Sequence, residues 1–198
     1  MSKHLALFDF DGTLTKKDTF LEFIKYLHGQ SGFLWGFLIH APFLIAMKLK
    51  LYPNWKVKEK IICHFFKGIE KEELEKQAKR FCEEQLPKLM RKTGVQQLEN
   101  HIKNGDKTYI VSASASLWIA PWCEKYALAL ISTELEIKNT YFTGKIAGKN
   151  CYGREKVDRI TALEDLKKYK HIFAYGDSRG DKQMLEIADK PHYKYFKD

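Results

Sequence analysis

The chain has 198 residues, of which 44% are hydrophobic and 30% charged, a composition typical of a globular protein. This length suits one core domain, or a core with a smaller inserted domain, and it needs no disulfides to bury most of its apolar surface. With 34 Lys and Arg against 25 Asp and Glu, the net charge of +9 favours anionic partners such as nucleic acid, anionic lipid or phosphorylated metabolites.

The cysteines are too far apart in the sequence for a zinc knuckle or a redox pair, so we expect reduced thiols in a cytoplasmic protein. They are Cys63, Cys82, Cys123 and Cys151. No signal peptide is predicted, because Asp9 and Asp11 interrupt the only early apolar run.

The first predicted element is a fully buried strand over 5–8, which is apolar without alternation and runs directly into Asp9 and Asp11. Gly29, Ser31 and Gly32 end the helical pattern that follows. Helical periodicity with an apolar face is present at 19–28, 55–66, 71–90 and 93–103.

After residue 105, strands and helices alternate. The pattern predicts strands at 108–114, 128–133 and 172–178, a hairpin around Asn139-Thr140, and helices at 117–126, 155–169 and 178–188. This order indicates an α/β fold with a Rossmann-like parallel sheet core, interrupted after its first strand by a helical block. We therefore predict a core of 1–16 and 92–198 and an inserted all-helical cap of 17–91.

Four aspartates follow the ends of predicted strands: Asp9, Asp11, Asp177 and Asp181. Ligands of open parallel sheets bind at the carboxyl edge of the strands, so these carboxylates are expected to meet there. Each pair about 4 Å apart would cost roughly 1–4 kcal/mol. Mg²⁺ would offset this repulsion, since it binds carboxylates together with water and phosphate oxygens.

Ser112 and Lys156 reach the same predicted edge, where a hydroxyl and an ammonium suit a phosphate group. Each of these residues alone has an ordinary explanation: Ser112 as a turn hydroxyl, Lys156 as a surface lysine, Asp181 as a helix first-turn acid. The two aspartates at the end of one buried strand are different, because they conflict with local stability, and such conflicts mark functional sites.

These residues resemble the four motifs of the haloacid dehalogenase superfamily. "DFDGTLT" resembles the first motif, Ser112 in "IVSAS" the second, Lys156 in "GREKVDRI" the third and "YGDSRGD" the fourth. The helical insertion resembles the type 1 cap. The nearest branch is similar to the phosphoserine phosphatases and includes bacterial phosphatidylglycerophosphate phosphatases.

The resemblance implies a Mg²⁺-dependent phosphomonoesterase. Asp9 would be the nucleophile that forms an aspartyl-phosphate, and Asp11 the general acid and base. The metal ligands would come from Asp9, Asp11, through its backbone carbonyl, and Asp177, with Asp181 supporting the metal through its waters.

The same resemblance implies a phosphate site built from Ser112 and Lys156 together with Gly12, Thr13 and Ala113. Asp18 stands where phosphoserine phosphatases usually have a Glu that meets the substrate ammonium. Because Asp is shorter, this candidate specificity residue weakens phosphoserine as the substrate.

The apolar stretch "FLWGFLIHAPFLIAMKLKL" is too short and too interrupted for a confident membrane span. It predicts either a buried helix pair of the cap or a peripheral membrane contact through 33–50 at the inner face of the membrane, with Lys48 and Lys50 at the headgroups. The second interpretation favours a phospholipid phosphate such as phosphatidylglycerophosphate as substrate.

Two other functions stay open on the sequence. One is a soluble phosphatase of the phosphoserine type that acts on a small phosphorylated metabolite. The other is a binding module on a catalytically degenerate scaffold, against which the intact Asp11 argues. A nucleic-acid partner is not expected, because the basic residues are scattered among acids and no RNA-recognition motif is present.

Overall fold

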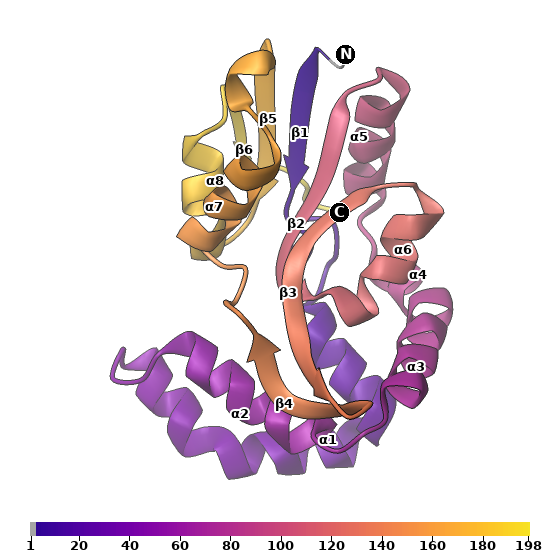
Figure 1. Ribbon diagram of the computed structural model, residues 1–198, viewed down its shortest axis with the longest axis vertical. Coiled ribbons are helices and arrows are strands. Elements are labelled where there is room, and N and C mark those ends of the chain that lie inside the picture. The colour runs from indigo at the N-terminus through magenta and orange to yellow at the C-terminus, as the bar shows by residue number, and fades with distance from the viewer. Residues whose placement is uncertain (1–2) are drawn as a thin grey trace.

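The computed structural model describes residues 3–198, and in this range the strands form one six-stranded sheet in the order β4-β3-β2-β1-β5-β6 (Figure 1). All neighbouring strands are parallel except β3 and β4. The predicted α/β fold with a parallel sheet is confirmed. The strands are β1 (His4–Phe8), β2 (Lys107–Ala115), β3 (Ala129–Lys138), β4 (Tyr141–Ala147), β5 (His171–Gly176) and β6 (Lys190–Tyr193).

Helices cover both faces of this sheet. Strand β1 has no alternation because its two faces meet two different apolar clusters: Ala6 and Phe8 pack in one, Leu5 and Leu7 in the other. Helix α5 belongs to the first side, and α7 and α8 belong to the second. The helices that follow the inserted block are α5 (Lys92–Lys103), α6 (Ala120–Lys125), α7 (Arg154–Leu163) and α8 (Lys182–Glu186).

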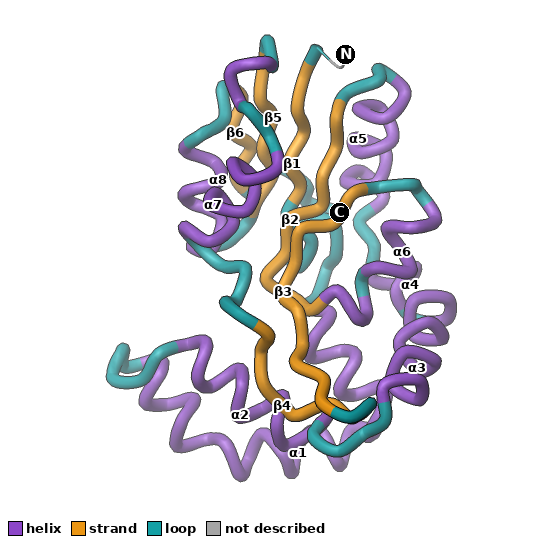
Figure 2. The backbone as a smooth tube through the Cα atoms, viewed as in Figure 1, coloured by secondary structure: helices purple, strands orange, loops and turns teal. Residues whose placement is uncertain are grey.

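The block between β1 and α5 lies beyond the carboxyl ends of the strands, at the lower end of the molecule in Figure 2. It contains α1 (Thr19–Lys48), α2 (Asn54–Phe66), α3 (Lys71–Glu84) and α4 (Leu86–Leu89). The chain leaves and re-enters the core at one place, because Arg91 N donates to Leu14 O at 2.7 Å and Lys16 N to Leu89 O at 2.8 Å. An inserted domain requires such paired connections, and the boundaries 17–91 stay a prediction.

Several element boundaries differ from those predicted. The break predicted at Gly29 is present as a kink, because Gly29 has the non-helical values φ 68° and ψ 175°, but a second helical segment follows, so that α1 continues through Pro42 to Lys48. The single helix expected over 71–90 is divided into α3 and α4, and the one expected over 155–169 ends at Leu163. Strand β6 was not predicted, because "KPHY" has neither an apolar run nor alternation and contains a proline.

The predicted hairpin is confirmed, and it turns at Asn139 (φ 49°) and Thr140 (φ 69°), two positive φ values that suit a tight hairpin. Strand β4 then packs on α2 so closely that a Cβ at Gly144 would lie 2.5 Å from the Cys63 Cα. The helical block is therefore covered in part by a β-hairpin, β3–β4, which comes from the other half of the chain and packs on α2.

Candidate active site

The carboxyl ends of β1, β2 and β5 meet at a pocket of about 550 Å³ between the sheet and the helical block. Its lining includes all four aspartates singled out in the sequence, together with Lys156 and the loop after Ser112. Residues that are far apart in the chain come together here because parallel strands end at one edge.

Lys156 lies in the interior of this cluster, 1% exposed. Its ammonium donates to Asp9 Oδ1 at 2.7 Å, to Asp181 Oδ1 at 2.6 Å and to the Val111 carbonyl at 2.7 Å, so all three protons are used. Burial disfavours the ammonium, but the two carboxylates outweigh it and hold the pKa of Lys156 above its usual range. Lys156 is therefore a permanent positive charge at the base of the pocket.

The positive charge of Lys156 does not fully offset the burial of Asp9 and the negative charges around it. Burial raises the pKa of the Asp9 carboxyl, the Lys156 ammonium lowers it, and the nearby Asp181 raises it again. Thr13 Oγ1 donates to the second oxygen, Asp9 Oδ2, at 2.9 Å. A further cation beside Asp9 would favour its ionised, nucleophilic form.

The structure offers a place for such a cation. Asp9, Asp177 and Asp181 each present one carboxylate oxygen, and these three atoms lie within 4.8 Å of one another. Among the described residues, the buried Asp177 Oδ1 has no hydrogen-bond donor. An orphaned buried carboxylate oxygen in a group of hard oxygen donors fits Mg²⁺.

Asp181 is held mainly by its own turn. Its Oδ2 accepts from Ser178 Oγ at 2.7 Å, from Ser178 N at 3.0 Å and from Asp177 N at 3.3 Å, which forms a capping box. Burial would raise the pKa of Asp181, but the Lys156 ammonium and the Ser178 donors lower it. Asp181 accepts from three donors on Oδ2 and from Lys156 on Oδ1, whereas Asp9 has one donor on each oxygen, so Asp181 is better suited to positioning Lys156 and the Asp177 backbone than to binding a cation directly.

Gly12 is required by a close approach. It has φ +80°, and a Cβ at this position would lie 2.3 Å from Asp177 Oδ2. The sequence assigned Gly12 to a phosphate site, and the structure shows a second reason for glycine: only a residue without a side chain lets the first strand-end loop pass beside Asp177.

The Asp11 carboxylate lies outside the group of three and points to the start of α1. Its Oδ1 accepts from Thr19 N and from Thr19 Oγ1, both at 2.6 Å, and its Oδ2 accepts from Ser112 Oγ at 3.4 Å. Thr19 Oγ1 in turn accepts from Trp118 Nε1 at 3.2 Å. Asp11 is therefore fixed at the pocket wall, between the sheet edge and the helical block.

Residues 6–186 match the family described as haloacid dehalogenase-like hydrolase. The chain belongs to this family. Protein CicA of Caulobacter vibrioides is 36% identical over 197 residues, which cover 98% of this chain and 86% of CicA.

Two further similarities are to phosphatases. A histidinol-phosphatase of Neisseria meningitidis is 25% identical over 203 residues, which cover 96% of this chain and 89% of that protein. The structure of a phospho-aspartyl intermediate analogue of phosphoserine phosphatase has a TM-score of 0.67 and 19% identity, covering 95% of this chain and 84% of that one. The predicted superfamily and the predicted enzyme class, a hydrolase of the phosphatase type, are both confirmed.

One residue at the site of this hydrolase was missed in the sequence. Lys58, from α2, lines the pocket and donates to the Ala113 carbonyl and to Asn150 Oδ1, the latter at 3.1 Å. Burial lowers the pKa of Lys58 to about 8, although Asp18 and Asp11 raise it. A single lysine on an amphipathic helix carries no sequence signal, so only its position reveals it.

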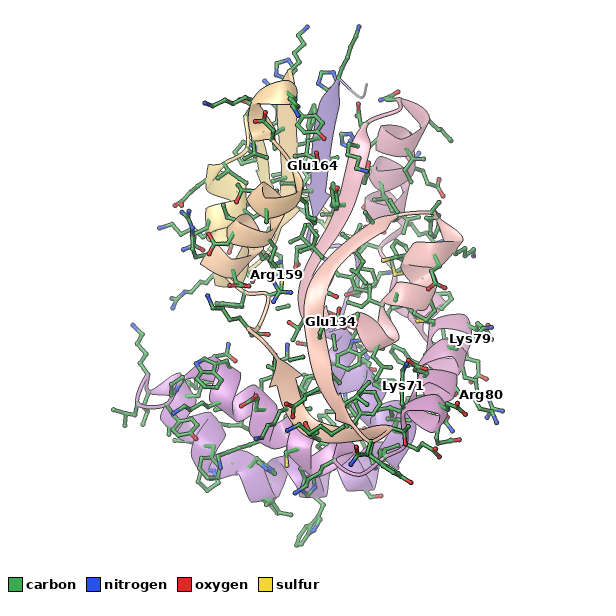
Figure 3. All side chains as sticks on the ribbon, in the orientation of Figure 1. Lys71, Lys79, Arg80, Glu134, Arg159 and Glu164 are labelled. Atoms are coloured by element: carbon green, nitrogen blue, oxygen red, sulfur yellow. The ribbon has the colours of Figure 1, made fainter. Side chains whose placement is uncertain are left out.

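The Asn150 loop is held in place from the side of the core. Arg159, labelled in Figure 3, donates from Nη2 to the Lys149 carbonyl at 2.7 Å, and Thr133 Oγ1 donates to Asn150 Oδ1 at 3.1 Å. Lys58 thus connects the helical block to two parts of the core of the hydrolase, the carboxyl end of β2 at Ala113 and the loop that holds Asn150.

The remaining predicted residues have structural partners of their own. Asp18 caps α1, its Oδ1 accepting from Leu21 N at 3.1 Å, and it also lines the pocket, where burial and the nearby Asp11 raise its pKa to about 6. Ser112 Oγ accepts from Ser114 N at 3.0 Å, which fixes the turn where Ala113 faces the pocket. Asp18 therefore has a capping role as well as a place at the pocket.

Proposed function

We propose that the chain is a Mg²⁺-dependent phosphomonoesterase that acts through an aspartyl-phosphate on Asp9. The observation that carries this proposal is the buried pairing of Asp9 with Lys156. This pair lies next to carboxylates that could hold a cation, and it opens to a pocket that also holds Asp11.

Asp9, Asp177 and the Asp11 carbonyl would hold the Mg²⁺, and Asp181 would support it through waters. When bound, Mg²⁺ would neutralise the carboxylates and the phosphoryl oxygens. Lys156, Ser112 and the Ala113 backbone would bind the remaining phosphoryl oxygens, with Gly12 and Thr13 shaping the loop beside them.

The chemical steps follow from the two first-strand aspartates. An Asp9 carboxylate oxygen attacks phosphorus, the bond to the substrate oxygen breaks, and Asp11 gives its proton to the leaving alcohol. Asp11 then takes a proton from a water that attacks the same phosphorus, which releases inorganic phosphate and restores Asp9. The hydrogen bonds from Thr19 keep the Asp11 carboxylate in place for both transfers.

A phospholipid phosphate such as phosphatidylglycerophosphate is the substrate that the pocket supports best. One wall of the pocket is apolar and comes from α1 and α2, while the opposite wall carries the aspartates. The apolar residues are Leu21, Phe37, Leu44, Met47, Val57 and Ile61. Such a wall suits the glycerol and acyl part of a lipid, and it supports the proposal that the enzyme acts in the cytoplasm, at the inner face of the membrane.

The second candidate is a small phosphorylated metabolite. The names of two similar proteins, histidinol-phosphatase and phosphoserine phosphatase, favour it. Asp18 lines the pocket, but it is shorter than the Glu usual in phosphoserine phosphatases, which does not favour phosphoserine in particular.

A substrate screen separates these candidates. Purified chain is incubated with p-nitrophenyl phosphate with and without Mg²⁺, and then with phosphatidylglycerophosphate, phosphoserine, histidinol phosphate and sugar phosphates. We expect Mg²⁺-dependent turnover, lost in Asp9→Asn, with the lipid preferred. Best turnover of a soluble phosphate would overturn the lipid substrate. No turnover of any phosphate by the wild type would leave the degenerate binding module.

A further inference from the structure

The second half of α1 and the turn into α2 expose a continuous set of large apolar side chains. We call it the α1–α2 apolar surface, and its members are between 48% and 76% exposed. Spacings of three and four residues place the α1 members on one side of the helix. The members are Leu34, Trp35, Leu38, Ile39, Ile45, Leu49, Leu51 and Trp55.

A buried core helix does not explain this surface. Among the described residues, α1 is the one helix that is long and apolar enough to cross a membrane, and only 11% of its most apolar window is buried. Such a helix is weak evidence by itself, because core helices and signal sequences have the same composition. Here the helix is largely unburied, which excludes the core interpretation and leaves the apolar surface without a partner.

A membrane-spanning helix does not explain it either, because the other side of α1 is packed against α2. Gly36 is buried, and a Cβ there would lie 2.2 Å from Phe65 Cζ. His40 is also buried and stacks edge-on with His64 at 5.1 Å. With one face on protein and one face exposed, α1 suits a position along an interface.

The charge around this surface has one sign. The chain contains no Asp or Glu between Glu22 and Glu59. Lys48, Lys50 and Lys56 are exposed beside the apolar members. In a dimer through this face, the lysines of two copies would face each other, whereas anionic headgroups would complement them. A negatively charged lipid surface is therefore the favoured occupant.

The surface is continuous with the candidate active site. Phe37, Leu44 and Met47 lie on the same helix as Leu38 and Ile45, but they line the pocket that also contains Asp9. One helix thus presents apolar side chains outward to the surroundings and inward to the reacting aspartates. The α1 and α2 helices lie at the lower end of the molecule in Figure 1, beyond the carboxyl ends of the core strands.

We propose that the α1–α2 apolar surface docks the enzyme on anionic bilayers, with α1 lying in the interface and the lysines at the headgroups. This proposal deepens the proposed function and rests on it for the lipid substrate, which would reach Asp9 along the inward side of α1. Docking itself needs no turnover.

Vesicle co-sedimentation tests the docking. The wild type is mixed with vesicles of phosphatidylcholine alone and with vesicles that also contain phosphatidylglycerol, at low and high salt. The test variant is the double substitution Trp35→Asp, Leu38→Asp, and the matched control is Leu163→Asp, at a leucine 62% exposed on α7. We expect binding to the anionic vesicles, weakened by salt, and reduced at least about tenfold in the double variant but not in Leu163→Asp.

Three results would overturn the proposal: binding no stronger than to neutral vesicles, equal binding of the double variant, or a concentration-dependent dimer that the double variant abolishes while vesicles stay unbound. Leu51→Asp, in the turn between α1 and α2, is a second test variant in the same vesicle assay, and its effect on binding does not depend on helix stability. Turnover of p-nitrophenyl phosphate by the wild type is measured separately. Its absence would refute the catalytic function without affecting the docking result.

Discussion

Lys156 Nζ lies 2.7 Å from Asp9 Oδ1 in the interior of the protein, although 147 positions separate the two residues in the chain. The same nitrogen lies 2.6 Å from Asp181 Oδ1. One lysine thus forms ion pairs with two buried carboxylates, and a third carboxylate, that of Asp177, lies beside them. This excess of negative charge accounts for both the expected stability and the expected chemistry of the site.

Lys156→Met should destabilise the fold as well as abolish turnover. It leaves Asp9 and Asp181 buried without their cation, and breaking a buried ion pair in this way costs about 3–5 kcal/mol. Urea unfolding measures the loss. The control Lys182→Met removes a 3.7 Å surface pair with Glu186, where the change should stay within about 0.5 kcal/mol. Equal, small effects of both substitutions would contradict the buried pairing.

Gly12→Ala should impair the site through Asp177. A Cβ at position 12 would lie 2.3 Å from Asp177 Oδ2, so the carboxylate must move. Gly148→Ala is a matched control, because Gly148 also has positive φ (+77°) but nothing within 4 Å of the added Cβ. Both variants should lose about 1 kcal/mol of unfolding free energy from backbone strain. Only Gly12→Ala should also lose most of its phosphatase activity and its Mg²⁺ response, in a p-nitrophenyl phosphate assay.

Asp177→Asn should separate metal binding from stability. A ligand that binds only the folded state adds about 2.7 kcal/mol at ~100 times its Kd, so Mg²⁺ should raise the Tm of the wild type. Without Mg²⁺, the variant should be at least as stable as the wild type, because burial and Asp181 already raise the pKa of Asp177 and oppose its charge. Thermal scans with and without Mg²⁺ check this. An unchanged Mg²⁺ shift in Asp177→Asn would contradict Asp177 as a ligand.

The sheet and the convergence of the acids could be predicted from the sequence for a physical reason. Apolar runs without alternation mark strands buried on both faces, and parallel strands must end at one edge. That rule predicts that Asp9, Asp177 and Ser112 lie near one another, and it brings Lys156, at the start of a predicted helix, to the same edge. The direct contact of Lys156 with Asp9 could not be predicted in this way, because it depends on how α7 packs.

Other features depend on tertiary contacts and had no local signal. The position of the helical segment after Gly29 is one such feature, because this segment packs on α2 through Gly36 and His40. The closure of the β3–β4 hairpin over α2 follows from the absence of a side chain at Gly144. Lys58 is one lysine among many, and its role at the pocket follows only from the fold.

The titration of Lys58 gives a pH-dependent prediction. Burial lowers its pKa in the folded state to about 8, against about 10.4 in the unfolded chain. The unfolded state then binds more protons between these values, so this group makes the free energy of unfolding increase as pH rises from about 8 to about 10. The difference in Tm between wild type and Lys58→Met should therefore shift in favour of the wild type over this range. A difference that does not vary with pH would show that Lys58 keeps its ordinary pKa.

Chemical trapping of the covalent intermediate identifies the residue that carries the phosphoryl group. The enzyme is quenched during turnover of a phosphomonoester with Mg²⁺ and treated with borohydride, which reduces an acyl phosphate to an alcohol. Fragmentation of the peptide 4–16 in a mass spectrometer then distinguishes Asp9 from Asp11. The account predicts reduction at Asp9 alone, dependent on both substrate and Mg²⁺. Reduction at another residue, or unmodified Asp9 in an enzyme that is turning over, would contradict it.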